Sequence, residues 1–451
     1  GNDDINDDDS ITMVDESNTE WTEEELAKLS LVEQAALRQP QNTTRRARRD
    51  TDVVGDSPVL KTVRADQPFV IGSAERLEEL AALVNSGATY GGNAFAEAQY
   101  KMVANIDLKN IASWTPIGTA VNPFNGTFDG NGYVISNMTI SAGDTIGLFG
   151  IEHENGVIQD VGVENVTVTG EISVGAIVGN NNGEIHNSYA TGNVEVTESS
   201  VGGIVGENNG EIYNSYAAVD VKGNDTYVGG LVGSNGGEIY NSYATGSVEG
   251  TKDSVGGLVG WNRDSGTISG SYATGNVAGI DSVGGLVGTN DSTGPIENSA
   301  ALNGFVNSHF NNYGAGKVIG NNNASGGIIN CYGWAGMIVN NSLGNGENGI
   351  ALNYTANGFD TNWNAILGDT SDWENTDAKS LPTLIDVGGP QSSQIPNYIQ
   401  NGSTATGTVT YISNAAELES FAQSVNTGKS YHGETVVLTD NIDLSGISNW
   451  T

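Results

Sequence analysis

A repeat of 27 to 28 residues is the feature that most constrains what this chain can fold into. Five copies of a Val-Gly-(Gly/Ala)-(Ile/Leu)-Val-Gly phrase begin at intervals of 27, 27, 27 and 28 residues, at Val174, Val201, Val228, Val255 and Val283. Divergent copies lie at Ile146-Gly-Leu-Phe-Gly150 and Lys317-Val-Ile-Gly320, which brings the total to about seven. A fixed period of this length indicates identical structural units that stack on one another.

Each unit contains three short β-rich segments separated by Gly and Asn clusters, with no room for a helix. An Ile-x-Asn-Ser-Tyr phrase, as in Ile212-Tyr-Asn-Ser-Tyr216, follows the Val-Gly phrase, and a third valine such as Val221 completes the unit. So short a unit cannot bury its own apolar side, so each strand should pair in parallel with its copy about 4.8 Å away. The sequence therefore predicts an all-β fold, a right-handed parallel β-helix or solenoid of about seven coils.

Stacking places equivalent side chains in columns. We expect two apolar columns to form the core: Ile177, Ile204, Leu231, Leu258 and Leu286 in one, and Ile185, Ile212, Ile239, Ile268 and Ile296 in the other. Two further columns are expected to stack or hydrogen-bond along the axis, the tyrosines Tyr189, Tyr216, Tyr243 and Tyr272 and the asparagines Asn187, Asn214 and Asn241.

Changes of composition and sequence pattern along the chain predict five segments. Residues 1–68 are polar and acidic, which predicts a disordered leader with one short helix that begins with a Thr22/Glu25 capping box. Residues 69–140 are expected to form a helix and β lead-in that caps the first coil, and residues 141–345 the solenoid. Residues 346–405 should form closing loops or a linker. Residues 406–451 repeat the lead-in and are interpreted as the truncated start of a second similar module.

Charge and cysteine content exclude several classes of function. The chain has 54 acidic and 17 basic residues and a net charge of −37, which argues against nucleic-acid binding and disfavours anionic membranes. Cys331 is the single cysteine, so the fold has no intrachain disulfide. No apolar run reaches 18 residues and the first residues are polar, so we expect no membrane insertion by this segment and any signal peptide or anchor to lie outside it.

No pattern of residues predicts catalysis, so no catalytic, cofactor-binding or metal-binding residue is assigned and the chain is predicted not to be an enzyme. A zinc peptidase would need His-Glu-x-x-His, but His153-Glu154 is followed by Asn-Gly-Val, and the remaining histidines are scattered. The alternative is a polysaccharide lyase or glycosidase, because parallel β-helices often carry such sites on one exposed strand face.

The column Glu184, Glu211 and Glu238 is the feature that such an enzyme could use. A rung spacing of about 4.8 Å imitates the carboxyl separation of a retaining glycosidase. Active sites are singular, however, whereas these glutamates recur with the repeat, which favours a structural, solvated column. Calcium bridging is the other reading, because adjacent carboxylates repel by roughly 0.9 kcal/mol per pair even in water.

Three weaker signals have both a functional and a structural reading. Tyr213 and Tyr240 could form a sugar-stacking stripe or simply decorate a strand. The run Arg45-Arg46-Ala47-Arg48-Arg49 could be a protease-processing site or a solvated linker. The Asn-x-Ser/Thr triplets at Asn125, Asn165 and Asn224 could accept glycans, although an Asn-rich chain produces such triplets by chance.

The repeats resemble the GLUG motif, named for its Gly-Leu-(any)-Gly signature, as in Gly230-Leu-Val-Gly233 and Gly257-Leu-Val-Gly260. The lead-in phrases Trp114-Thr-Pro-Ile-Gly118 and Phe124 to Gly132 resemble the segment that precedes such repeats, so the resemblance covers roughly residues 70–390. The motif occurs in large secreted surface proteins, including adhesin-like proteins and the non-catalytic regions of IgA-specific metallopeptidases.

The resemblance implies a secreted or cell-surface stalk or adhesin-like module that binds or displays. Its partners would be a host or matrix glycan or protein and the remainder of a longer polypeptide. A passive spacer within a larger secreted peptidase is the second alternative, after the carbohydrate-active enzyme.

Overall fold

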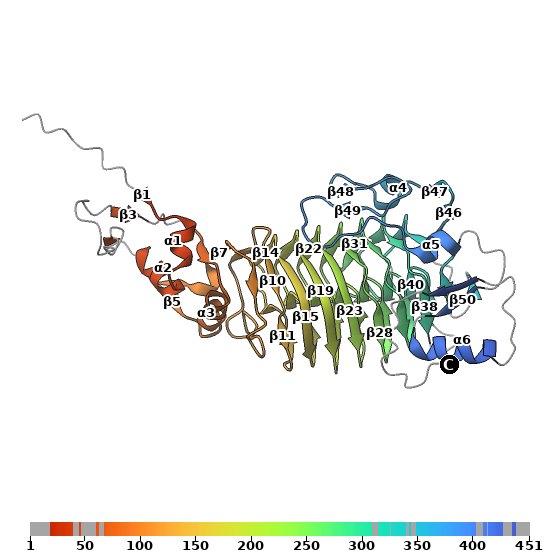
Figure 1. Ribbon diagram of the computed structural model, residues 1–451, viewed down its shortest axis with the longest axis horizontal. Coiled ribbons are helices and arrows are strands. Elements are labelled where there is room, and N and C mark those ends of the chain that lie inside the picture. The colour runs from red at the N-terminus through yellow and green to blue at the C-terminus, as the bar shows by residue number, and fades with distance from the viewer. Residues whose placement is uncertain are drawn as a thin grey trace, which may run out of the picture.

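The chain forms an elongated parallel β-solenoid of about nine turns, as its computed structural model shows (Figure 1). The structure describes residues 19–38, 45–46, 60–62, 67–308, 314–324, 326–339, 342–343, 349–402, 409–412, 414–426 and 435–438. Strands dominate and helices are few, which confirms the predicted fold class.

A ten-stranded parallel sheet runs along the solenoid and contains the isoleucine of each Ile-x-Asn-Ser-Tyr phrase, whereas the tyrosine lies in a neighbouring sheet. Its strands in spatial order are β4 (Phe69–Ile71), β7 (Gln99–Met102), β9 (Thr127–Asp129), β14 (Val157–Gln159), β18 (Glu184–His186), β22 (Glu211–Tyr213), β26 (Glu238–Tyr240), β31 (Thr267–Ser269), β36 (Ile296–Glu297) and β41 (Ile328–Ile329).

Two seven-stranded parallel sheets hold the Val-Gly phrases. The β12 sheet consists of β12 (Thr145–Ile146), β16 (Ser173–Val174), β20 (Ser200–Gly202), β24 (Val228–Gly229), β29 (Asp253–Gly256), β34 (Asp281–Gly284) and β39 (Ala315–Gly316). The β13 sheet consists of β13 (Phe149–Ile151), β17 (Val178–Asn181), β21 (Val205–Asn208), β25 (Val232–Asn235), β30 (Val259–Asn262), β35 (Val287–Asn290) and β40 (Ile319–Asn322).

A sixteen-stranded sheet closes each turn and contains the third valine of each unit. Its strands, in chain order, are β8 (Ile106–Asp107), β10 (Val134–Ser136), β11 (Thr139–Ile140), β15 (Gly162–Gly170), β19 (Tyr189–Val196), β23 (Tyr216–Gly223), β27 (Tyr243–Ala244), β28 (Val248–Gly250), β32 (Tyr272–Ala273), β33 (Val277–Gly279), β37 (Ala300–Ala301), β38 (Phe305–Ser308), β42 (Tyr332–Trp334), β43 (Ile338–Val339), β44 (Ser342–Leu343) and β45 (Ile350–Leu352).

The register aligns each residue with its own copy in the next coil, as the repeat predicts. Ile185 pairs with Ile212, and Ile212 with Ile239, and the same alignment continues to Ile296. Every member of the two predicted core columns is at most 1% exposed. The apolar columns are therefore the buried interior of the solenoid.

The predicted count of about seven coils was too low. Strands β4, β7 and β9 of the lead-in pair in parallel with one another and with β14, so they extend the same ten-stranded sheet toward the N-terminus. Their sequences lack the Val-Gly phrase on which the count relied. The lead-in helix α3 (Ala74–Asn85) buries Leu77, Leu80, Ala81 and Val84 beside these turns, next to a small hairpin, β5 (Thr89–Tyr90) and β6 (Asn93–Ala94), and a 3-10 turn, Phe95–Glu97.

Two short helices, rather than the one predicted, lie against the first strand of the solenoid. The helices α1 (Glu23–Ala27) and α2 (Leu31–Leu37) each begin with a capping box, Thr22 with Glu25 and Ser30 with Glu33. The predicted disorder of residues 1–68 falls mostly on residues outside the described part of the chain. Besides these two helices, the elements described in residues 1–68 are the small strands β1 (Thr19–Glu20), β2 (Arg45–Arg46) and β3 (Leu60–Thr62). Residues 47–49 of the basic run lie outside the described part of the chain.

Residues 349–402 fold back along the side of the solenoid instead of extending from its end (Figure 1). They contain β46 (Tyr354–Thr355), β47 (Gly358–Phe359), α4 (Trp363–Leu367), β48 (Trp373–Glu374), β49 (Thr383–Leu384) and α5 (Asn397–Gly402). The tyrosine column stacks as predicted, with ring centroids 4.8 to 5.1 Å apart. This closing segment covers it: the hydroxyls of Tyr216 and Tyr272 donate to the carbonyls of Gly388 and Pro382 at 3.0 and 2.7 Å.

The start of the lead-in recurs after the closing segment. Strand β50 (Val409–Ile412), helix α6 (Ala415–Asn426) and strand β51 (Thr435–Leu438) repeat the order of β4, α3 and β7. Tyr411 pairs with Val437 in parallel, as Val70 pairs with Lys101 in the first copy. The predicted continuation of this second module lies outside the described residues.

We predict that Leu231→Asp unfolds the solenoid, because an unpaired carboxylate in this fully buried column costs about 4 kcal/mol or more. Leu231→Ile, which copies Ile204 of the preceding coil, should cost less than about 1.5 kcal/mol. Circular dichroism melts of the two variants measure the difference. A fully stable Leu231→Asp protein would mean that this column is not the core.

Candidate binding site

Three large side chains break the repeat in neighbouring coils and meet on one outer face. In the neighbouring coils the column of Trp261 contains Asn180, Glu207, Ser234 and Thr289, and the two coils on either side of Tyr227 have serine in its column. Two residues beyond Trp261 lies Arg263, where the coils on either side have Gly236 and Asp291. We call Tyr227, Trp261 and Arg263 the Trp261 patch.

Tyr227 and Trp261 form a stacked pair across two coils. Their ring centroids are 4.5 Å apart and the planes are inclined by 20°. Tyr227 has a φ of 65°, a left-handed conformation that Ser254 also adopts one coil later. A bulky side chain at such a φ carries a strain of about 1–3 kcal/mol. The stacked geometry is therefore maintained despite backbone strain at Tyr227. A serine at this position would be less strained.

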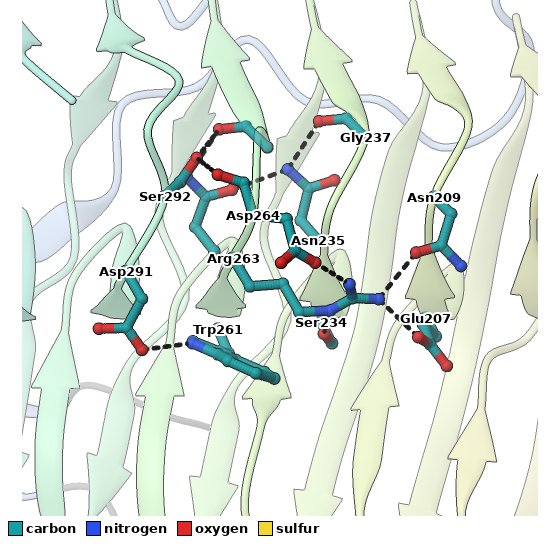
Figure 2. A network of polar contacts seen from close by, with 12 residues as sticks. Glu207, Asn209, Ser234, Asn235, Gly237, Trp261, Arg263, Asp264, Asp291 and Ser292 are labelled. Carbon is teal, nitrogen blue, oxygen red and sulfur yellow. Dashed lines mark hydrogen bonds and ion pairs between the residues drawn. The ribbon is translucent and has the colours of Figure 1, made fainter. Parts of the chain in front are cut away.

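Arg263 connects three coils through the polar network in Figure 2. Its Nε donates to Ser234 Oγ at 2.9 Å, and its Nη2 donates to Asn209 Oδ1 at 2.7 Å. It also forms an ion pair with Glu207 at 2.5 Å and a second one with Asp264. The absence of a side chain at Gly236 leaves its path open, because a Cβ there would lie 3.0 Å from Arg263 Nη1.

The network extends to a fourth coil on the other side of Trp261. The indole Nε1 donates to Asp291 Oδ2 at 2.8 Å, which fixes the ring orientation (Figure 2). The guanidinium carbon of Arg263 lies 5.8 Å from the Trp261 ring centroid. Two partly exposed rings are thus held rigidly and bordered by a guanidinium, an amide and three carboxylates. This chemistry suits binding of a flat, polyhydroxylated ligand.

An amide ladder beneath this face supports the site, and it is not the ladder predicted from the sequence. Each of the fully or largely buried residues Asn181, Asn208, Asn235, Asn262 and Asn290 donates from Nδ2 to Oδ1 of the next asparagine, at 2.7 to 3.0 Å.

The predicted column, Asn187, Asn214 and Asn241, lies instead at the ends of strands with φ near 50°. Asn187 donates to Asp160 and Asn241 to Asp372, while Asn214 Oδ1 is buried without a partner. The predicted bonds between the three amides are therefore not formed, although Asn187 does donate along the axis, to Asp160 in the preceding position of its column. Asparagine recurs in this column because the turn needs a left-handed residue.

The glutamate column lies on the outer face of the ten-stranded sheet, as expected from strand alternation. Burial raises the pKa of Glu211, and the charges of Glu184 and Glu238 raise it further. The three carboxylates therefore repel one another as predicted. Within the described ranges, no group of three or more His, Cys, Asp or Glu side chains is placed to hold a metal ion, and calcium bridging stays an untested expectation.

Tyr213 and Tyr240 form a stack with His186 on the same face. Adjacent rings are 4.7 and 4.9 Å apart and nearly parallel. Tyr213, the inner ring of the three, therefore presents both faces to its neighbours and only its edge to solvent. This geometry favours mutual packing over a sugar-stacking stripe.

A shallow groove of about 360 Å³ crosses the sixteen-stranded sheet and contains Glu195, Asp220, Lys222 and Glu249. Two of its carboxylates have partners, as those of the Trp261 patch do: Asp220 accepts from the Ser247 amide at 2.8 Å, and Glu195 accepts from Asn224 at 3.4 Å. No aromatic ring lines it. The Trp261 patch is therefore the stronger candidate site, and its signal in the sequence is the local loss of the repeat.

Sequence comparison identifies the repeating unit. The GLUG motif matches residues 170–195, 197–222, 224–249 and 253–278. Four consecutive coils are GLUG repeats. The Tyr227–Trp261 pair joins the third and fourth of them.

Two curated relatives match a part of the chain. Halomucin from Haloquadratum walsbyi is 38% identical over 141 residues, which cover 29% of this chain and 1% of halomucin. A protein named as a Gly-rich membrane protein, from Evansella cellulosilytica, is 35% identical over 132 residues, which cover 27% of this chain and 14% of that protein. The chain thus spans only a small fraction of either relative.

The solenoid is also similar to a solved structure, that of a candidate immunoglobulin A1 protease from Bacteroides ovatus. The two align with a TM-score of 0.50 and 23% identity, over 71% of this chain and 93% of the other. At this identity the likeness concerns the fold. No helix in the described part of this chain is both long enough and apolar enough to span a bilayer.

We predict that Arg263 and Glu207 are energetically coupled by about 1 kcal/mol, because their side chains are only 17% and 31% exposed. A double-mutant cycle with Arg263→Asn and Glu207→Ser, each a residue found in the same column one or two coils away, measures this from denaturation midpoints. The exposed pair Lys252 and Asp225, at 3.6 Å, is the control and should show a smaller coupling. Equal coupling energies for the two pairs would contradict a specific interaction between Arg263 and Glu207.

Proposed function

We propose that this chain is a section of a secreted or cell-surface stalk with an adhesin-like role, which binds a glycan at the Trp261 patch and does not catalyse a reaction. The observation that carries the proposal is the gathering of the repeat-breaking residues Tyr227, Trp261 and Arg263 on one outer face of an otherwise uniform solenoid.

The stalk role is supported by the architecture. About nine turns at a rung spacing of about 4.8 Å give a rigid rod roughly 40 Å long. The recurrence of the β4–α3–β7 start in β50, α6 and β51 favours further modules in series. The names of the two curated relatives, a mucin and a membrane protein, support a location at the surface.

The glycan is favoured as ligand by the chemistry of the patch. A pyranose ring has a flat face of C–H groups, which packs on an indole or phenol, and peripheral hydroxyls, which bond to carboxylates and amides. Trp261 and Tyr227 supply the rings, while Asp291, Glu207 and Asn209 supply acceptors at their border. Such a patch is small compared with the roughly 800 Å² per partner of a standard protein interface.

The test is a glycan and matrix-protein array probed with the whole chain, with calcium or with a chelator. Wild type should bind a glycan saturably and release no product. The double variant Tyr227→Ser, Trp261→Ser should lose at least tenfold in affinity, because both serines copy neighbouring coils and leave the fold intact.

Tyr240→Ser, which copies Ser269 in the other aromatic stack, is the matched control and should bind normally. Loss of binding in this control alone would move the site to the ten-stranded sheet. Release of fragments would overturn the non-catalytic proposal, and an absence of binding would favour a passive spacer.

A further inference from the structure

The asparagine ladder has a direction that leaves its first member in need of a donor. From Asn181 to Asn290, every Nδ2 donates to the Oδ1 one coil further along the chain. Each Oδ1 from Asn208 onward thus receives an N–H from the coil before it. Asn181 Oδ1 accepts only a local bond, from the Gly183 amide at 3.1 Å. A donor for its other lone pair must come from the preceding coil.

The residue at that position is Glu152. Ile151 is in register with Asn180, and the Glu152 amide donates to the Asn180 carbonyl at 3.0 Å, so Glu152 lies opposite Asn181. Its side chain is 0% exposed, and neither carboxylate oxygen has a hydrogen-bond partner among the residues that the structure describes. A Cβ at Gly156 would lie 2.5 Å from its Cγ, which shows how tightly the carboxyl is enclosed.

An ionised carboxylate is unfavourable in this position. It would be a buried charge without a donor, next to the oxygen of an amide that is itself an acceptor. Burial raises the pKa of Glu152 well above its usual value, and the negative charge of Glu184 on β18 raises it further. The other titratable groups nearby in the chain are His153, whose Nδ1 is buried without a partner, and the exposed Glu154.

We propose that Glu152 carries a proton at neutral pH and donates it to Oδ1 of Asn181, so that a neutral glutamic acid is the first member of the amide ladder. The ladder then has a donor at every rung from β13 to β40. Loss of the proton removes the first donor and leaves a buried charge, so this end of the solenoid is sensitive to alkaline pH.

The direction of the pH dependence follows from proton linkage. The unfolded chain loses this proton near pH 4.3, about the pKa of a free glutamate, whereas the folded chain retains it to a higher pH. The stabilisation is therefore complete below the unfolded pKa and decreases as the pH rises toward the folded pKa. Over that interval the unfolding constant increases by up to about tenfold per pH unit, and above the folded pKa the effect levels off.

The decisive variant is Glu152→Gln, whose amide supplies an N–H at every pH. Compared with wild type in denaturant unfolding, it should be equally stable near pH 4 and increasingly more stable as the pH rises, by roughly tenfold or more in the unfolding constant at neutral pH. The control Glu154→Gln, on the surface two residues away, should retain the wild-type pH dependence. Parallel pH profiles for wild type and Glu152→Gln would overturn the proposal.

Infrared spectroscopy of the wild-type chain tests the same point without depending on how a variant folds. At neutral pH the exposed carboxylates are ionised, so a carboxylic-acid C=O band reports a group that has kept its proton. We expect such a band, its disappearance under alkaline conditions and its absence in Glu152→Gln. A wild-type spectrum without this band would mean that Glu152 is ionised, with a bound cation or water as its partner, and would contradict the proposal.

Discussion

Everything in this structure depends on the parallel pairing of each coil with its own copy. The register aligns valine with valine, isoleucine with isoleucine and asparagine with asparagine. Each side chain must therefore pack next to an identical side chain one rung away. Aliphatic side chains do so by packing, and tyrosines by stacking at 4.8 to 5.1 Å. Asparagine is suited to a buried column because its amide is both donor and acceptor. Glutamate has no such option, and its column is accordingly on the outer face.

The same pairing leaves a problem at the first strand, which has no copy before it. The side chain of Gln34 takes the place of the missing copy. Its amide accepts from the Val70 N–H at 2.8 Å and donates to the Val70 carbonyl at 3.0 Å. A glutamine thus satisfies both groups of an edge residue as a further strand would, and Arg38 lies over the Phe69 ring, 4.0 Å from its centroid. An edge covered in this way cannot pair with another chain there.

The sequence predicts what repeats and fails where a contact depends on a single residue. Periodicity was sufficient for the strands, their register and the core columns, because each member gives the same information. It could not decide which asparagine column is the ladder, since Asn187 and Asn181 begin series of similar period and differ in backbone conformation and burial. The contacts of Gln34 with Val70 and of Arg263 with Glu207 join residues 36 and 56 positions apart in the sequence, and each is made once, so no repeated phrase predicts them. The lead-in turns were missed because they pair with the solenoid without sharing its phrase.

A residue that breaks its column loses the partner that the repeat would have supplied, so something else must replace that partner. A small residue that differs from its column, such as Gly236 or Thr289, needs no replacement for the lost partner. Trp261 and Arg263 are different, because each is held by several specific contacts, and Tyr227 maintains its stack in a strained conformation. Glu152 breaks the amide column with a buried carboxyl, a group that can continue the column when it keeps a proton. In a solenoid, the residues that differ from their column and are fixed by specific contacts are therefore the ones that give the protein its individual properties. The regular coils between them set the distances between these residues.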